Sequence, residues 1–306
     1  MMVALAVLYD RIITKRITTW ISGIIKDVQS GFQKFKSTLH QLFTIRLLTA
    51  IAKKSNTTLY LGLFDLEKAF DKISRYKMLK KLIKMGISHV MFGALKRIYL
   101  ETYCILSFGN EFSTEFRTYC GVRQGAASSA LIFIGYINDL VEYLEERCPQ
   151  EQILEDLHCL LHADDTAILS TDRQLFIYKC NCMLDYFAEN SLSLNLSKSG
   201  FLIINGLEAD KTDIQLKNGI LEYKSMLTYL GIKISDSGKL KYDIESYIDG
   251  KRPNITIKFG NFCRTNFLAP LDIKLKVLNS CVINSKNSGL ISLILAFLFC
   301  FLNSYS

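Results

Sequence analysis

LHCLLHADDTAILS, residues Leu157–Ser170, is the most informative segment of this chain. Two adjacent carboxylates, Asp164 and Asp165, separate two short aliphatic runs of strand length, and an Asp-Asp pair between such runs favours a turn. We therefore predict a β-hairpin that holds both carboxylates at its tip. Two like charges so close together are costly to keep ionised unless a cation shares them, and Mg²⁺ prefers such carboxylate oxygens. The alternative is a solvated Asp-Asp turn.

A second acidic segment follows another apolar run. Leu59–Phe64, LYLGLF, suits a strand that is covered on both faces, and Asp65 stands at its end. Acidic side chains at the exit of a buried strand occupy a position that active-site residues often take. Taken alone, FDLEKAFD (64–71) is equally compatible with the start of a surface helix. If Asp65 joins the Asp-Asp pair, strand 59–64 must lie beside the 157–170 hairpin in one antiparallel sheet.

Periodicity and turn signals predict the remaining elements. Apolar residues at helical spacing predict helices over 3–29, 37–53, 73–84, 89–100, 130–144, 174–189 and 239–284. Shorter apolar runs beside turn residues predict strands over 103–108, 115–119, 201–204, 214–216, 220–223 and 227–234. A glycine-bracketed loop, Cys120–Gly125, precedes the 130–144 helix, and such loops allow a backbone to approach a phosphate or a base.

The composition is that of a packed protein. Of 306 residues, 49% are hydrophobic and only three are proline, which excludes a disordered chain. The net charge of +8 suits a polyanionic partner, although most basic residues are dispersed, with local clusters at 72–84 and 251–264.

The nine cysteines lack the spacing of a metal site. Cys180 and Cys182 have no second pair, and a strand would send His158 and Cys159 to opposite faces, so we do not expect a zinc site. An odd number of cysteines without a signal peptide indicates reduced thiols and an intracellular protein, nuclear or cytoplasmic.

Both ends of the sequence contain apolar runs. The first, MMVALAVLYDR, has no basic region before it and is not typical of a secretory signal. The second, Gly289–Leu302, is shorter than the roughly 18 residues expected of a membrane span. It is compatible with a buried terminal helix, a non-native end or a membrane anchor.

Six short segments follow one another in a fixed order along the chain. They are QSGFQKFKST (29–38), FDLEKAFD (64–71), GVRQGAASSALIF (121–133), HADDT (162–166), LNLSKS (194–199) and YLG (229–231). Together they resemble the reverse transcriptase domain of non-LTR (LINE-type) retrotransposons over about residues 8–235. The resemblance implies an α+β fold: a polymerase palm of antiparallel sheet and packed helices (59–235), partial fingers (1–58), a helical thumb-like region (236–288) and a hydrophobic tail (289–306).

The resemblance also implies an activity, that of an RNA-directed DNA polymerase acting on an RNA template, a DNA primer and deoxynucleoside triphosphates. Asp65 and Asp164 would bind two Mg²⁺ ions, with Mn²⁺ as a substitute, while Asp165 completes the cluster and the carbonyl of Leu66 adds a ligand. One metal would lower the pKa of the primer 3′-hydroxyl, and the other would steady the triphosphate and the departing pyrophosphate.

Further roles follow from the same resemblance. Phe70 would lie under the incoming sugar and favour deoxynucleotides by clashing with a ribose 2′-hydroxyl; its alternative is an ordinary core phenylalanine. Gln124 and Gly125 would contact the nucleotide and the template strand. Lys198 would protonate the leaving pyrophosphate; its alternative is a solvated lysine.

The primer and template would be bound by Arg123 and by Tyr229-Leu230-Gly231.

Two residues depart from the family pattern without removing a metal ligand: His162 replaces an aromatic residue and Ala130 replaces a proline. The family's fingers strands would lie upstream of the first match. Because those strands carry the basic residues that bind the triphosphate, an alternative function is a catalytically silent nucleic-acid-binding remnant. A third class, a membrane-tethered protein, depends only on residues 289–302.

Overall fold

The computed structural model describes residues 4–241, except for residues 101, 110, 124 and 239. Contacts within the chain divide it into two units, Met1–Lys241 and Tyr242–Ser306. Four predicted features therefore lie outside the described residues, namely Gln124, the basic cluster 251–264, the apolar tail 289–302 and nearly all of the 239–284 helix. Among the described helices, none combines the length and the apolar character needed to cross a membrane.

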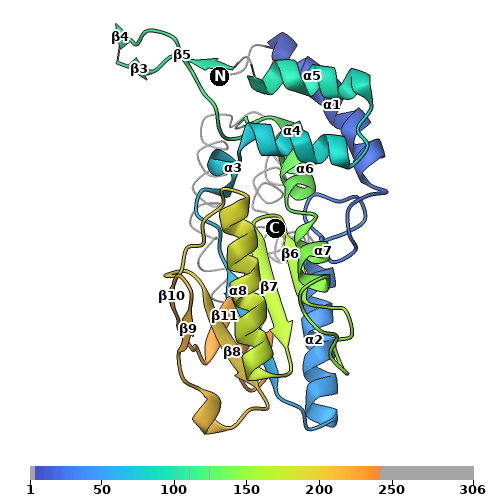
Figure 1. Ribbon diagram of the computed structural model, residues 1–306, viewed down its shortest axis with the longest axis vertical. Helices are drawn as coiled ribbons and strands as arrows, with labels where there is room; N and C mark the ends of the chain where they lie inside the picture. The colour runs from blue at the N-terminus through green and yellow to red at the C-terminus, as the bar shows by residue number, and fades with distance from the viewer. Residues whose placement is uncertain (1–3, 101, 110, 124, 239, 242–306) are drawn as a thin grey trace, which may run out of the picture. The chain divides into compact units, whose positions relative to one another are not determined.

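A four-stranded sheet lies at the centre of the described unit (Figure 1). Its strands lie in the order β6 (Cys159–His162), β7 (Asp165–Ser170), β1 (Leu59–Phe64) and β8 (Gly200–Ile204), and every neighbouring pair is antiparallel. The predicted pairing of strand 59–64 with the Asp-Asp hairpin is therefore confirmed. Since helices pack on this sheet, the α+β fold class is confirmed as well.

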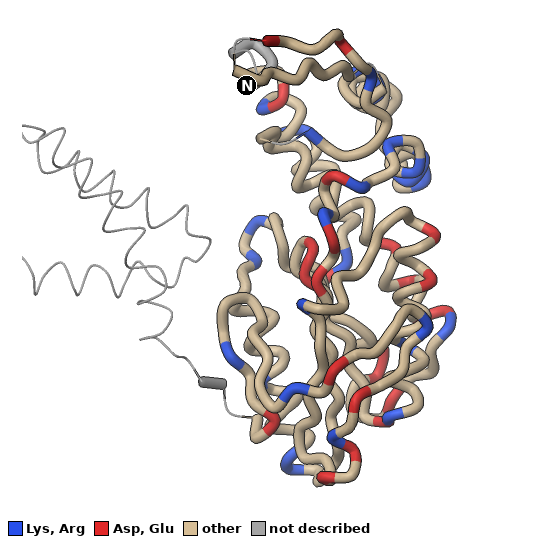
Figure 2. The backbone as a smooth tube through the Cα atoms, turned by 90° about the vertical axis from the view of Figure 1, so that its left-hand side faces the viewer, with Lys and Arg blue, Asp and Glu red and all other residues tan. Residues whose placement is uncertain are grey.

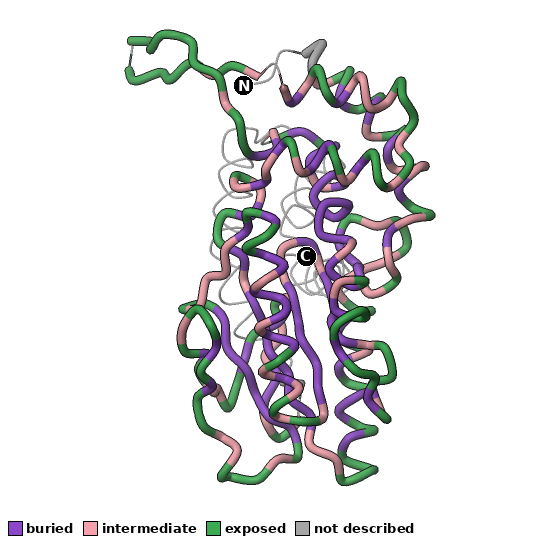
Figure 3. Tube along the Cα trace, viewed as in Figure 1, coloured by how far each residue is buried: buried purple, intermediate pink, exposed green. Residues whose placement is uncertain are grey.

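Strand β1 is buried along its whole length, as its continuous apolar sequence predicts (Figure 3). Successive side chains point to opposite faces, so Tyr60 and Phe64 join one hydrophobic cluster while Leu61 and Leu63 join another. Helix α8 (Arg173–Glu189) supplies the first cluster, and helix α2 (Thr38–Lys54) supplies the second. The sheet thus lies between two helical layers, and packing against both layers fixes the positions of its strands.

The other described helices are short or peripheral to the sheet. They are α1 (Ala4–Ile21), α3 (Ala69–Lys72), α4 (Arg75–Lys84), α5 (His89–Leu100), α6 (Ala127–Tyr136) and α7 (Leu140–Glu145), with a 3₁₀ turn at Glu208–Asp210. Within the described residues, Lys and Arg are distributed over many elements and do not form one continuous strip (Figure 2).

The remaining strands form small ladders. They are β2 (Tyr103–Cys104) with β5 (Phe116–Arg117), β3 (Ser107–Phe108) with β4 (Glu111–Phe112), β9 (Ile214–Leu216) with β10 (Gly219–Leu221), and β11 (Met226–Tyr229), β12 (Ile232–Ser235) and β13 (Leu240–Lys241) in that order. The predicted hairpin over 103–119 is therefore two short ladders on one arm.

The prediction of a single strand over 227–234 is wrong. The segment folds back on itself as the hairpin β11–β12, in which Tyr229 pairs with Ile232. Leu230 (φ 50°) and Gly231 (φ 84°) both adopt left-handed backbone conformations, which the two-residue turn of such a hairpin requires. The glycine therefore marks a turn and not a bulge inside a strand.

Three predicted helices also differ from the structure. The 3–29 helix ends at Ile21, because the following segment leaves the helix and pairs with the sheet at Leu161. The 130–144 helix is two helices, because the Asn138 side chain accepts a hydrogen bond from the Lys26 amide and donates one to the Ile24 carbonyl. Residues 240–241 begin as strand β13 because they pair with β12.

Candidate active site

The antiparallel register brings the acidic residues to one end of the sheet. Phe64 of β1 lies opposite Thr166 of β7, so the same register continued by one residue sets Asp65 opposite Asp165. Asp165 also pairs with His162, which leaves Ala163 and Asp164 as the two-residue loop of the β6–β7 hairpin. Asp164 therefore occupies the tip, whereas Asp165 is already the first residue of β7. The prediction that both carboxylates lie at the tip is therefore wrong for Asp165.

The Ala163–Asp164 turn is tight. Ala163 has a φ of 57°, in the left-handed region that alanine rarely enters. Its side chain is buried, whereas Asp164 and Asp165 are both partly exposed. The turn therefore presents the two carboxylates toward solvent from a buried support.

Asp65 is held by the loop that carries Lys198. The Asn195 amide donates to the Asp65 carbonyl at 2.8 Å, and the Asp65 amide donates to Ser199 Oγ at 3.3 Å. Lys198 Nζ lies 3.8 Å from Asp65 Oδ2, with the lysine side chain 69% exposed and the aspartate side chain 33% exposed. The structure thus brings Lys198 and Asp65 together, as the predicted site requires.

The backbone of Leu66 has a defined direction. Leu66 and Leu194 form an antiparallel bridge through the hydrogen bonds of the residues that flank them. In such a non-hydrogen-bonded pair each residue turns its own carbonyl away from its partner. The Leu66 carbonyl is therefore directed away from Leu194.

These donors suit a hard divalent cation in their chemistry. All the candidate ligands are oxygen atoms, which are the ligands that Mg²⁺ prefers. They come from the carboxylates of Asp65, Asp164 and Asp165 and from the backbone carbonyl of Leu66. Lys198 shows that this end of the sheet already attracts a positive charge. Among the residues described, however, no group of three or more His, Cys, Asp or Glu side chains is arranged as a metal site.

The glycine loop packs against the segment that follows Asp65. Val122 donates its amide to the carbonyl of Phe70 at 2.9 Å, and Phe70 stacks on Phe133 with ring centroids 4.5 Å apart. Arg123 is half-buried, with its carbonyl accepting from Ser129 Oγ at 2.7 Å, whereas Gly125 is exposed with a φ of 82°. The loop therefore lies beside the backbone of Phe70, while the Phe70 ring packs on helix α6.

The Tyr229-Leu230-Gly231 segment divides into a buried part and an exposed part. The Tyr229 side chain is buried, and burial, reinforced by the nearby Asp165 charge, raises its pKa. Leu230 is half-buried and Gly231 is exposed at the hairpin turn. The turn of this hairpin therefore faces solvent, while the tyrosine ring lies in the core beneath it.

Sequence analysis missed two residues that support the site. Asp10, almost fully buried, accepts hydrogen bonds from the Ala127 amide and from Ser128, and so caps α6 just behind the glycine loop. A signal was present, since Asp10 shares helical spacing with the buried Ile13 and Ile17. The second is Gln29, whose side chain reaches the Ala163 turn.

Comparisons with known proteins agree with this architecture. Residues 2–234 match the family Reverse transcriptase (RNA-dependent DNA polymerase). The Transposon TX1 uncharacterized 149 kDa protein of Xenopus laevis is 24% identical over 232 residues, which are 74% of this chain and 18% of that protein.

Two solved structures share the fold at low sequence identity. Apo telomerase from Candida tropicalis, truncated from its C-terminal domain, is 13% identical with a TM-score of 0.54, covering 76% of this chain and 45% of that one. Telomerase from Candida tropicalis in complex with a TWJ fragment of telomeric RNA has the same identity and TM-score, covering 92% of this chain and 46% of that one. The chain thus spans less than half the length of these relatives. Since the family match extends over most of it, the chain belongs to the reverse transcriptase (RNA-dependent DNA polymerase) family.

Proposed function

We propose that this chain carries the catalytic palm of an RNA-directed DNA polymerase of a retrotransposon, which adds deoxynucleotides to a primer 3′-hydroxyl. The observation that carries the proposal is the β1–β7 register, in which Phe64, the residue before Asp65, lies opposite Thr166, the residue after Asp165, beside the Asp164 turn. In a member of the reverse transcriptase family, acids at this end of an antiparallel sheet are suited to phosphoryl transfer, which depends on positioning and charge neutralisation.

Reverse transcriptases generally use divalent metal ions. In this chain, Asp65, Asp164 and Asp165 would hold two Mg²⁺ or Mn²⁺ ions together with the Leu66 carbonyl. When bound, such ions lower the pKa of the attacking hydroxyl and neutralise charge on the triphosphate and the leaving pyrophosphate. The protein's own contribution is to keep these oxygen atoms at fixed positions, and the buried β1–β7 ladder suits that task.

Neighbouring residues would handle the nucleotide and the nucleic acid. Lys198, 3.8 Å from Asp65 and mostly exposed, can reach a leaving pyrophosphate and donate a proton to it. The Phe70 ring would exclude a ribose 2′-hydroxyl, and Gly125 with Gln124 would contact the nucleotide and the template. Arg123 and the Leu230-Gly231 turn would contact the primer and template.

The same proposal assigns regions of the chain. Residues 1–58 would be part of the fingers, 59–235 the palm and 236–288 a thumb-like region, with an apolar tail at 289–306. An RNA template, a DNA primer and deoxynucleoside triphosphates would be the partners.

Primer extension by the purified full chain tests the function. With an RNA template, a labelled DNA primer, deoxynucleotides and Mg²⁺ or Mn²⁺, we expect template-directed extension that Asp65→Asn abolishes. A chain that binds the primer–template and yet extends it with neither metal would instead be a silent nucleic-acid-binding remnant.

A further inference from the structure

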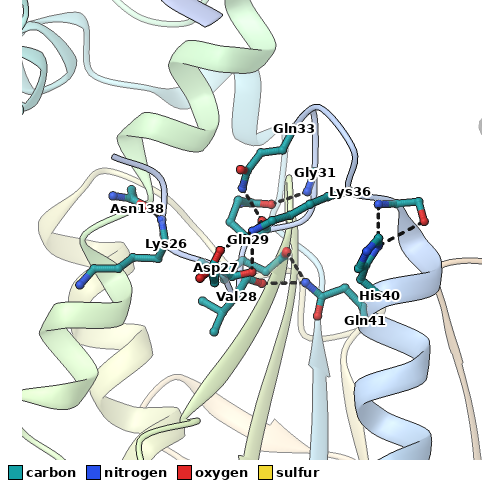
Figure 4. Close-up of polar contacts among 12 residues, drawn as sticks. Lys26, Asp27, Val28, Gln29, Gly31, Gln33, Lys36, His40, Gln41 and Asn138 are labelled. Atoms are coloured by element: carbon teal, nitrogen blue, oxygen red, sulfur yellow. Dashed lines mark hydrogen bonds and ion pairs between the residues drawn. The ribbon is translucent and has the colours of Figure 1, made fainter. Parts of the chain in front are cut away.

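The loop between α1 and α2 adds an edge to the catalytic sheet (Figure 4). Gln29 forms a parallel bridge with Leu161 of β6. The Ser30 amide donates to the Leu161 carbonyl at 2.9 Å, and the Leu161 amide donates to the Val28 carbonyl at 3.0 Å. The segment that contains Gln29 is therefore fixed beside the strand that leads into the Ala163–Asp164 turn.

The Gln29 side chain connects this edge to the turn itself. Its Oε1 accepts hydrogen bonds from the Gly31 amide at 2.8 Å and from the Ala163 amide at 3.0 Å. Two backbone donors on one atom identify that atom as the amide oxygen, because the other end of the side chain can only donate. Gln29 is completely buried, so solvent cannot replace the bond to Ala163.

Ala163 needs this support because of its conformation. Its left-handed φ of 57° is disfavoured for alanine, and Asp164 follows it directly. Gly31 lies against the same residue: a Cβ at Gly31 would come within 2.5 Å of the Ala163 nitrogen, so only glycine fits. Ser30 Oγ lies 2.8 Å from His162 Nδ1 on the preceding residue. Three consecutive residues of the loop thus contact the hairpin turn.

We propose that Gln29 is a positioning residue for the catalytic carboxylates: its side-chain oxygen holds the Ala163 amide and thereby sets where Asp164 presents its carboxylate beside Asp65. The inference rests on the proposed polymerase function, because it assigns Gln29 a role in the metal site of that function. Groups that orient metal ligands from behind typically change metal affinity by about 10–100-fold when removed.

A second buried glutamine provides a matched control. Gln41 Nε2 donates to the Val28 carbonyl at 2.7 Å and to the Leu161 carbonyl at 3.0 Å. Gln41, which lies on helix α2 close to Val28 (Figure 4), therefore joins the same two backbone segments. The hydrogen bonds described for its side chain do not reach the Ala163–Asp164 turn. Replacing either glutamine with methionine removes buried hydrogen bonds of similar number, but only Gln29→Met releases Ala163.

The experiment measures Mn²⁺ binding by electron paramagnetic resonance, together with primer–template binding, thermal unfolding and the Mg²⁺ dependence of extension. We expect Gln29→Met to weaken Mn²⁺ binding about 10-fold or more, to raise the Mg²⁺ needed for half-maximal extension by a similar factor, and to leave primer–template binding unchanged. Gln41→Met should lose stability comparably but keep wild-type Mn²⁺ affinity. Gln29→Glu retains an acceptor oxygen, and since burial favours its protonated form, it should bind Mn²⁺ more tightly than Gln29→Met and close to wild type.

Equal Mn²⁺ affinities for Gln29→Met, Gln41→Met and wild type would overturn the positioning role while leaving the polymerase function intact. If Gln29→Met does not fold, a 10-fold loss of Mn²⁺ affinity in Gln29→Glu would overturn it equally. Wild-type protein that neither binds Mn²⁺ nor extends a primer would remove the proposed function, and this inference with it.

Discussion

Phe64 of strand β1 lies directly opposite Thr166 of strand β7, and both residues are buried. Asp65 and Asp165 stand one position further along the same ladder, so two acids far apart in the sequence leave the sheet at the same end. A slip of one residue would turn Leu61 and Leu63 from one hydrophobic cluster to the opposite face. The packing that stabilises the fold therefore also sets the relative positions of the acids.

Phe70→Ala tests the discrimination between sugars. If the ring excludes a 2′-hydroxyl, the variant should use ribonucleotides about 10-fold or more better relative to deoxynucleotides, a range typical of one steric contact. Single-nucleotide incorporation with matched ribo- and deoxynucleotides measures this ratio. A parallel loss of both activities together with a lower melting temperature would show that Phe70 serves only to pack on Phe133.

Lys198→Met tests the proton donor. Because general acids contribute about 10²–10⁴-fold to rates, incorporation should slow by about 100-fold or more while primer–template binding stays unchanged. Lys217→Met is the control, since Lys217 also forms an exposed ion pair, with Asp185 at 2.5 Å. Rapid-quench measurement of one incorporation step compares the two. Equal rates in both variants would make Lys198 an ordinary solvated lysine.

Gly121→Ala tests the packing of the glycine loop. Gly121 has a φ of 78°, and a Cβ there would lie 2.9 Å from the Asp71 carbonyl oxygen. We expect a loss of more than about 1 kcal/mol in the free energy of unfolding, because strain and a backbone clash add. Gly109→Ala shares the left-handed backbone (φ 60°) but meets open space, so it should lose less. Urea denaturation of wild type and both variants measures the free energies of unfolding. Equal losses of unfolding free energy in the two variants would show that the clash with Asp71 contributes nothing.

The buried His158 should make stability depend on pH. Burial, aided by the Lys179 charge, lowers its pKa below the ordinary 6.5, although Glu151 and Asp156 oppose this. Below about pH 6.5, His158 is therefore protonated in the unfolded chain but stays neutral in the folded chain. The free energy of unfolding should fall as pH falls through this range, by at most about 1.4 kcal/mol per pH unit. Urea denaturation at pH 7.5 and 5.5 should show a smaller difference in His158→Met than in wild type. The control is His40→Gln, at an exposed histidine. If His158→Met shows the same difference in unfolding free energy between the two pH values as wild type and His40→Gln do, His158 is not the cause of the pH dependence.

Apolar periodicity explains why much of this fold could be predicted. The continuous run at Leu59–Phe64 and the Asp-Asp pair between aliphatic runs are local signals, and they correctly identified the central strand and its hairpin partner. Local signals could not show that Leu230 and Gly231 form a turn, because the flanking residues are as apolar as those of a strand.

The supporting polar contacts were harder to predict for a different reason. Gln29 and Asp10 act by bonding backbone amides of Ala163 and Ala127, which lie more than a hundred positions away in the sequence. The partner in such a bond is a backbone group that every residue carries, so helical spacing can mark Asp10 as an inward-facing residue but cannot identify the amide that it binds.

Asp164→Asn gives the most direct test of the catalytic site. Nucleic-acid binding depends on phosphate contacts and counterion release, whereas extension depends on the carboxylates, so the two should separate. Filter binding and primer extension, measured side by side with Mg²⁺ on wild type and Asp164→Asn, should show the same salt-dependent affinity for a primer–template in both proteins and extension by wild type only. Extension by Asp164→Asn at the wild-type rate would contradict the assignment of this carboxylate to catalysis.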